Sequence, residues 1–179
     1  MLIAQPFMHD VPFRRSVILL CDYTREDGAI GFILNKPLNM QIDRLVADFP
    51  DMDSTAFYGG PVATNTIHYL HNYGDLLEGS TEVFKGVFWG GDFDKLKFLI
   101  DTKMISPDRI RFYVGYSGWS ENQLEEELTN GSWVLDCADP NYIYKVKADN
   151  LWSEVMIHKG GAYAVMGQMP KEIAKTSLN

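Results

Sequence analysis

Cysteine is scarce in this sequence, with only Cys21 and Cys137 among its 179 residues. The two lie far apart and form no C-x-x-C pair, which argues against both a disulfide framework and a zinc ribbon. We therefore expect a protein of a reducing compartment, and for this chain that compartment is the cytoplasm.

Long apolar stretches are also missing. The longest clean apolar run extends from Val17 to Cys21, far short of the roughly 20 residues that a membrane-spanning helix requires. The N-terminal stretch, MLIAQPFMHDVPFRRSV, has no basic lead and no continuous apolar segment, so it lacks the pattern of a signal peptide. The sequence predicts a cytoplasmic protein that does not act at a membrane.

Positive charge is in the minority. Lys and Arg number 16 against 24 Asp and Glu, which gives a net charge of −8. Proteins that bind nucleic acid by neutralising phosphates usually display a basic surface, so direct nucleic-acid binding is not expected. An acidic total can still conceal a basic patch. The arginines able to form one, if the fold gathers them, are Arg14, Arg15, Arg109 and Arg111.

The composition is that of a globular protein. Hydrophobic residues make up 46% and charged residues 22% of the chain, the usual proportions of a buried core under a solvated surface. The chain contains no internal repeat, no low-complexity tract and no linker rich in Ser, Gly or Pro. A single domain over residues 1–179 is expected.

Hydrophobic patterning predicts short strands interspersed with helices. Arg15–Tyr23 and Ala29–Leu34 read as a hairpin whose near-continuous apolar character indicates strands covered on both faces. A helical stripe of apolar residues predicts a helix over Gln41–Phe49, capped by Asn39. Further strands are expected at Thr66–Leu70, Arg109–Tyr116 and Trp133–Cys137. Further helices are expected after Asp92, over Glu121–Asn130 behind a Ser120–Gln123 capping box, and over Leu151–His158 behind Asp149.

The segment Gly115–Trp119, GYSGW, places a serine between two glycines. A nucleophile elbow needs G-x-S-x-G on a sharp turn, and Trp119 occupies the second glycine position, so we predict no catalytic role for Ser117. We interpret Gly115 and Gly118 as residues that let the chain turn. The glutamates that follow are interpreted as a solvated helix face rather than a binding site. They are Glu121, Glu125, Glu126 and Glu127.

Glycine-framed turns are the candidate ligand sites. Asn35 and Lys36 follow an apolar strand, where side chains emerge at a sheet edge, although Asn35 can instead hydrogen-bond the turn that Pro37 fixes. The pair Gly59–Gly60 also has a sufficient structural reason in its turn alone. The candidate ligand-binding residues are Asn35, Lys36, Gly59, Gly60, Gly118 and Trp119.

No metal, cofactor or catalytic residue is predicted. His68 and His71 are three apart on a predicted strand, so they point to opposite faces and do not easily share a metal. No glycine cluster gives a P-loop or G-x-G-x-x-G, the patterns that hold phosphates or dinucleotides.

Four segments, together with Ser16–Val17 in the first long strand, carry a family resemblance. They are GFILNKP at 31–37, YGGPV at 58–62, GYSGWSENQLEEEL at 115–128 and GSW at 131–133. With them the chain resembles the AlgH/YqgE family of bacterial proteins, which are described as uncharacterised proteins or transcriptional regulators. Glu121–Asn122 departs from the proline-glycine pair that the family commonly has before Gln123. That departure predicts a changed first turn of the following helix.

The resemblance implies an α+β fold with a bulged, mixed or antiparallel, partly barrel-like sheet flanked by helices. It brings no established catalytic residue. We therefore expect a regulatory or binding protein that acts through an unknown protein partner or small ligand. The alternative is an enzyme with a non-standard site in a cleft lined by the glycine turns, using Lys36 or a carboxylate as acid or base. A DNA-binding regulator ranks last.

Overall fold

The computed structural model describes residues 1–170, which contain ten strands and six helices. The strands are β1 (Leu2–Ala4), β2 (Val17–Thr24), β3 (Gly28–Ile33), β4 (Pro37–Gln41), β5 (Thr55–Tyr58), β6 (Val62–His71), β7 (Ser80–Phe84), β8 (Val87–Gly90), β9 (Ile110–Trp119) and β10 (Trp133–Leu135). The helices are α1 (Ile42–Leu45), α2 (Phe93–Asp101), α3 (Gln123–Thr129), α4 (Pro140–Tyr144), α5 (Ala148–Lys159) and α6 (Gly161–Gly167). Two 3-10 turns, Val11–Phe13 and Pro107–Arg109, precede β2 and β9.

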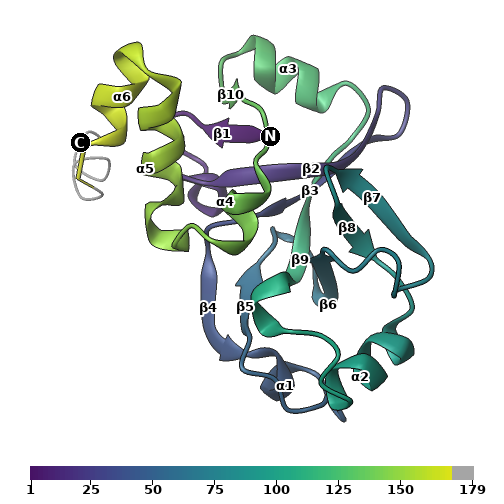
Figure 1. Ribbon diagram of the computed structural model, residues 1–179. Helices are drawn as coiled ribbons and strands as arrows, with labels where there is room; N and C mark the ends of the chain where they lie inside the picture. The colour runs from purple at the N-terminus through teal and green to yellow at the C-terminus, as the bar shows by residue number, and fades with distance from the viewer. Residues whose placement is uncertain (171–179) are drawn as a thin grey trace.

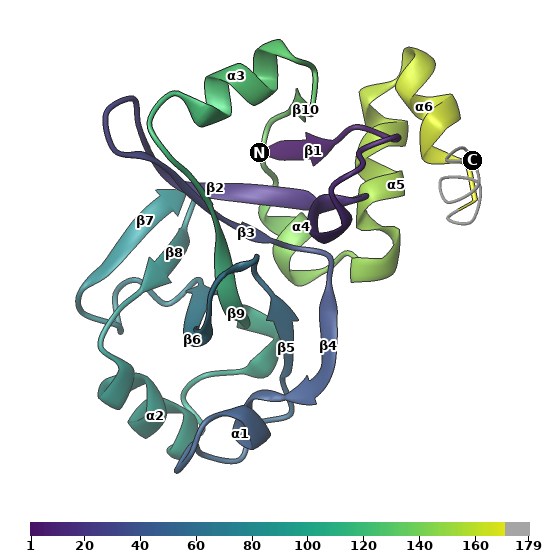
Figure 2. The ribbon, with the colours of Figure 1, turned by 180° about the vertical axis from the view of Figure 1, so that it is seen from behind.

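The strands form one curled, largely antiparallel sheet in the order β10-β1-β2-β3-β9-β6-β8-β7 (Figures 1 and 2). β5 joins it by pairing with β9 in parallel, and β4 pairs with β5. The register shifts within β2–β3, β6–β9 and β7–β8 mark bulges, which bend a sheet and increase its twist. The predicted α+β fold with a bulged, partly barrel-like sheet is confirmed.

The strands β1 and β2 are covered on both faces, which the apolar run of the hairpin predicts for β2. Ile3, Val17 and Leu19 face a cluster that includes side chains of α4 and α5. Leu2 and Ile18, which alternate with them, face the opposite side and pack with residues of α3 and β10. Successive side chains of a strand point to opposite faces, so this alternation places helices on both sides of β1 and β2.

Helix α2 closes the far end of the sheet, away from α3 (Figure 1). The Asp92 side chain accepts a hydrogen bond from the Lys95 backbone N–H at 2.8 Å, so Asp92 caps this helix as predicted. Leu96, Leu99 and Ile100 are buried in a cluster with side chains of β6 and β9.

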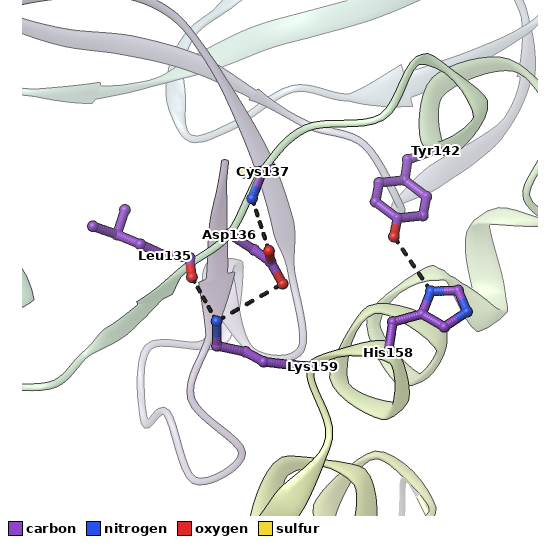
Figure 3. Close-up of polar contacts among 6 residues, drawn as sticks. All are labelled: Leu135, Asp136, Cys137, Tyr142, His158 and Lys159. Carbon is purple, nitrogen blue, oxygen red and sulfur yellow. Dashed lines mark hydrogen bonds and ion pairs between the residues drawn. The ribbon is translucent and has the colours of Figure 1, made fainter.

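Polar contacts tie the C-terminal end of α5 to the edge of the sheet (Figure 3). Lys159 Nζ donates to the Leu135 carbonyl oxygen at 2.9 Å and lies 3.8 Å from the Asp136 carboxylate. The Tyr142 hydroxyl and His158 Nδ1 are 3.3 Å apart and link α4 to α5. Because β10 is an edge strand, Lys159 satisfies a carbonyl group that the sheet leaves unpaired.

The prediction of a helix over Gln41–Phe49 is wrong in its extent. β4 occupies Pro37–Gln41, and the helix that follows is only the four-residue α1. Val46 is already extended and Asp48 has a φ of +54°. Phe49 nevertheless packs in the same cluster as Ile42. The apolar spacing that predicted a helix therefore marks core residues, and a loop brings the later ones into the core.

The prediction of a turn at Gly115 and Gly118 is also wrong, because β9 runs unbroken to Trp119. Gly115 has a φ of +65° and lies opposite the irregular stretch of β6 between Val62 and Ile67. It marks a bulge rather than a turn, and a Cβ there would lie 2.7 Å from the Val62 carbonyl oxygen.

Two predicted helix starts differ in detail. Only half of the capping box forms, with the Ser120 backbone N–H donating to Gln123 Oε1 at 3.0 Å, and the N-cap of α3 is Asn122. The N-cap of α5 is Lys147, so Asp149 lies inside its first turn. Within residues 1–170, no helix has the length and apolar character needed to cross a membrane.

Candidate functional site

The N-terminal loop, residues 5–15 between β1 and β2, lines two cavities. Its residues 5–13 form one wall of a cavity of about 570 Å³, which we call the aromatic pocket. Arg14 and Arg15, at the other end of the loop, line a second cavity of about 500 Å³, the basic cleft. The two cavities therefore share a single stretch of chain.

The floor of the aromatic pocket is a set of fixed rings. The indole N–H groups of Trp119 and Trp133 both donate to Glu127 Oε2, at 2.9 and 2.7 Å. Gln123 Nε2 donates to the other carboxylate oxygen of Glu127 at 3.0 Å. Phe13 packs on both indoles, with ring centroids 6.3 Å from Trp119 and 5.6 Å from Trp133. Glu127 thus locks β9, α3 and β10 together beneath the pocket.

The charge of the aromatic pocket is negative. Asp10 and Glu127 line it, and His9 is the one lining group, among residues 1–170, able to carry a positive charge. Aromatic faces attract cations and pack against apolar groups, and carboxylates accept hydrogen bonds. The pocket therefore suits a molecule with an apolar body and hydrogen-bond donors.

Asn35 shapes the basic cleft by hydrogen bonds to the backbone. Its Oδ1 accepts from the Val17 N–H at 2.9 Å, and its Nδ2 donates to the Arg15 carbonyl oxygen at 2.8 Å. Arg15 has a φ of +51°, a conformation that non-glycine residues rarely adopt. Asn35 therefore holds Arg15 in a backbone geometry that the chain alone does not favour.

Lys36 and Arg15 bring charge into the same cleft. Burial lowers the pKa of Lys36, the nearby Arg14 lowers it further, and Asp10 opposes the shift. Lys36 Nζ donates to the Pro12 carbonyl oxygen in the N-terminal loop. The Arg15 guanidinium lies 4.6 Å from the centroid of the Trp152 ring and donates from Nη2 to the Met169 carbonyl oxygen at 2.6 Å.

The remaining predicted ligand residues fall into two groups. Gly118 and Trp119 line the aromatic pocket, as Asn35 and Lys36 line the basic cleft. Gly59 and Gly60 are among the lining residues of neither cavity. A Cβ on either glycine would lie within 2.3 Å of the β9 backbone. Close packing against β9 is therefore a sufficient reason for both glycines, and their contact with a ligand stays a prediction.

Ser117 and the two histidines of β6 have structural surroundings. Ser117 is fully buried and its hydroxyl donates to the Gly59 carbonyl oxygen at 3.0 Å. The His68 ring packs near Phe32, whereas the His71 ring stacks on Phe88 on the other side of β6. In the part of the chain that the structure describes, no three His, Cys, Asp or Glu side chains are grouped so that they could hold a metal ion.

Sequence reasoning missed Glu127 and Trp133 as parts of the pocket. Glu127 belongs to the glutamate cluster that was interpreted as a solvated face, yet its carboxylate is half-buried and accepts three hydrogen bonds. The signal that could have found it is spacing. Gln123 and Glu127 are four residues apart on one helix face.

Comparison with known proteins identifies the family of this chain. A family model described as AlgH-like (DUF179) matches residues 1–164. A UPF0301 protein of Chlorobium phaeobacteroides is 39% identical over 171 residues, covering 96% of this chain and 91% of the relative. A UPF0301 protein of Cytophaga hutchinsonii is 35% identical over 170 residues, covering 94% and 93%.

Solved structures show the same fold. The solution structure of the AlgH protein from Pseudomonas aeruginosa matches with a TM-score of 0.73 at 25% identity, covering 94% of this chain and 92% of that one. A crystal structure of a protein from Corynebacterium diphtheriae matches with a TM-score of 0.77 at 20% identity, covering 94% and 90%. The whole-length family match and these relatives show that the chain belongs to the AlgH-like family of UPF0301 proteins.

Proposed function

We propose that this protein is a cytoplasmic binding protein that regulates a partner through a small ligand held in the aromatic pocket. The observation that carries the proposal is a cavity of about 570 Å³ whose aromatic floor is fixed by Glu127. Small-molecule sites have volumes of roughly 300–1,000 Å³, with mostly apolar linings and a few placed polar groups. A floor whose rings are already hydrogen-bonded loses little freedom when a ligand binds.

The chemistry of the lining favours an apolar or aromatic molecule that bears an amine or amide. Asp10 and Glu127 supply acceptors, and the rings of Phe7, Phe13 and Trp119 supply apolar contact. Phe7 is 54% exposed at the pocket. A ligand would bury part of that ring and change the surface that a protein partner meets, which gives binding a route to regulation.

Native mass spectrometry of the full chain, purified gently from its own cells, tests this proposal. We expect a non-covalent adduct of a few hundred daltons that Phe7→Ala weakens, since that variant removes a lining ring. Phe98→Ala is the matched control, because Phe98 is 61% exposed on α2 and lines neither cavity. A bare chain with a stoichiometric protein partner, or equal loss in both variants, would overturn the proposal.

Direct contact with nucleic acid is not part of the proposed function. Support for this comes from the net charge of −8 and from the arginines, since Arg109 and Arg111 do not join Arg14 and Arg15 in the basic cleft. Any effect on transcription would then be indirect.

The alternative, an enzyme with a non-standard site, is favoured by one observation. Lys36 lies in the basic cleft, and burial lowers the pKa of its amine. Titratable groups with shifted pKa values cluster at catalytic sites. Turnover of a candidate substrate that disappears in Lys36→Met but persists in the exposed control Lys103→Met would support this reading.

A further inference from the structure

The basic cleft concentrates positive charge in an acidic protein. Three of the 16 cationic side chains of the sequence, those of Arg14, Arg15 and Lys36, line it. Asp149 is the single carboxylate among its lining residues within the described part of the chain. The net charge of −8 makes such a gathering unexpected by composition alone.

The cleft is built rather than accidental. The Asn35 side chain donates a hydrogen bond to the Arg15 carbonyl oxygen. The Arg15 guanidinium lies over the ring of Trp152, which is 2% exposed. The Nε–H of Arg15 is buried and has no hydrogen-bond partner among residues 1–170. Leaving a buried charged donor unpaired is costly, and an acceptor that reached the Arg15 guanidinium would relieve that cost.

The first half of α5 forms one wall of the cleft. Asp149, Trp152 and Ser153 of this 12-residue helix line it. The Trp152 ring supports the Arg15 guanidinium from this side.

We propose that the basic cleft binds a small phosphate monoester, with Arg14, Arg15 and Lys36 around the phosphoryl group. A phosphate monoester carries about −1.5 to −2 charges at neutral pH. The three cations and one carboxylate of the lining leave a net positive charge of about the same size. Guanidinium groups offer paired donors to phosphate oxygens. Ser153 is placed to take a hydroxyl group of the rest of the molecule. This site is separate from the aromatic pocket and opposite to it in charge.

The burial of Lys36 agrees with this assignment. Its pKa is lowered because the cleft takes the ammonium out of water. A phosphate bound beside it would favour the protonated form and raise that pKa again. Binding should therefore be accompanied by proton uptake at a pH where the free amine is partly neutral.

Isothermal titration calorimetry on the full chain in phosphate-free buffer tests the proposal with ribose 5-phosphate as the probe. We expect saturable binding of ribose 5-phosphate, competition by inorganic phosphate, and none by ribose. Arg14→Gln should weaken the affinity about tenfold or more, because a hydrogen bond to a charged group contributes about 1.5–3 kcal/mol. The matched control is Arg25→Gln, an exposed arginine in the β2–β3 turn, which should bind like the parent.

Lys36→Met is a second variant that keeps the apolar stem and removes the charge. Its affinity for ribose 5-phosphate should fall by a similar factor while its far-UV circular dichroism stays that of the parent. Equal binding of ribose, equal weakening by Arg25→Gln, or parent-like affinity in both folded cleft variants would each overturn the proposal. Absence of saturable binding up to millimolar ribose 5-phosphate would do the same. None of these results depends on whether the aromatic pocket holds a ligand.

Discussion

The Glu127 carboxylate accepts hydrogen bonds from three residues on three elements: Trp119 of β9, Gln123 of α3 and Trp133 of β10. Helix α3 is only seven residues long, and a helix of that length is marginal without tertiary contacts. Leu124 and Leu128 pack against the sheet, and the Tyr23 hydroxyl donates to Glu125. Glu127 adds the contacts that join the helix to two strands at once.

Replacing Glu127 by Gln keeps the shape and removes the charge and one acceptor oxygen. We expect the free energy of unfolding, measured by urea denaturation, to fall by about 1–3 kcal/mol. The near-ultraviolet circular dichroism of the tryptophans should weaken as well. Glu126→Gln, an exposed neighbour on α3, should change stability by less than about 0.5 kcal/mol. Equal losses in the two variants would contradict the role given to Glu127.

Asn122, the N-cap of α3, has a backbone conformation that few residues adopt. It has φ +60° and ψ −7°, a left-handed conformation that glycine adopts freely and that asparagine tolerates better than most residues. The changed first turn that Glu121–Asn122 predicts relative to the family stays a prediction. The side-chain identity was visible in the sequence, but the required φ was not.

At the scale of elements, His71 joins β6 to β8 and to the following loop. Its Nε2 lies 2.8 Å from the Gly90 carbonyl oxygen, and its Nδ1 accepts from the Tyr73 N–H at 3.1 Å. An Nδ1 that accepts must be unprotonated, so Nε2 carries the proton of a neutral ring. Burial lowers the pKa of His71 below its ordinary 6.5, and the bond to Gly90 opposes this shift.

We expect stability to decrease as the pH falls below about 6.5, because the unfolded state then binds a proton that the folded state excludes. The contribution is fully present above that pH and is lost as the pH falls through the folded pKa. The free energy of unfolding in urea, followed from about pH 7 to about pH 5, measures it. His71→Asn should reduce the slope, whereas the exposed control His158→Gln should not. An unchanged slope in His71→Asn would rule out this assignment.

The elements that sequence patterning predicted best are those with local signals. The hairpin β2–β3 and the capped helix α2 form as expected, because turn residues and the Asp92 cap act within a few positions. The helix over Gln41–Phe49 failed because β4 pairs with β5, residues 55–58, a contact between segments that no local pattern reveals. The same applies to Gly115, whose bulge depends on the register of β6.

On the scale of the whole molecule, β9 is the strand on which the sheet converges. It pairs with β3, β5 and β6, and Phe112 and Tyr113 on its opposite faces belong to two different hydrophobic clusters. Its far end delivers Trp119 to the aromatic pocket. Local opening of β9 would therefore disrupt most of the core at once.

Native-state hydrogen exchange should show this hierarchy. The amides of Phe112 and Val114 are expected to exchange only by global unfolding, because β9 is paired on both sides. Amides of the edge strand β7, which pairs only with β8 among the described strands, should exchange at lower free energies. Slower exchange in β7 than in β9, measured by NMR, would contradict this order.

The two cavities could be predicted only in part. Asn35, Lys36, Gly118 and Trp119 were found because polar or aromatic residues sit beside glycines and strand ends. Sequence gave no reason to join them to the N-terminal loop. Phe13 and Arg15 lie in that loop, far along the chain from Trp133 and Trp152 that they contact, and only the sheet order brings them together.

The position of β1 has a consequence for how the protein is made. β1 is paired on one side with β2 and on the other with β10, where Ile3 lies opposite Val134. A ribosome makes β2 soon after β1, but it makes β10 only about 130 residues after β1. During that time the nascent chain exposes a strand edge rich in apolar residues, the kind of surface that recruits chaperones or other chains. The late arrival of this three-residue strand thus sets the moment at which synthesis can close the free edge of β1.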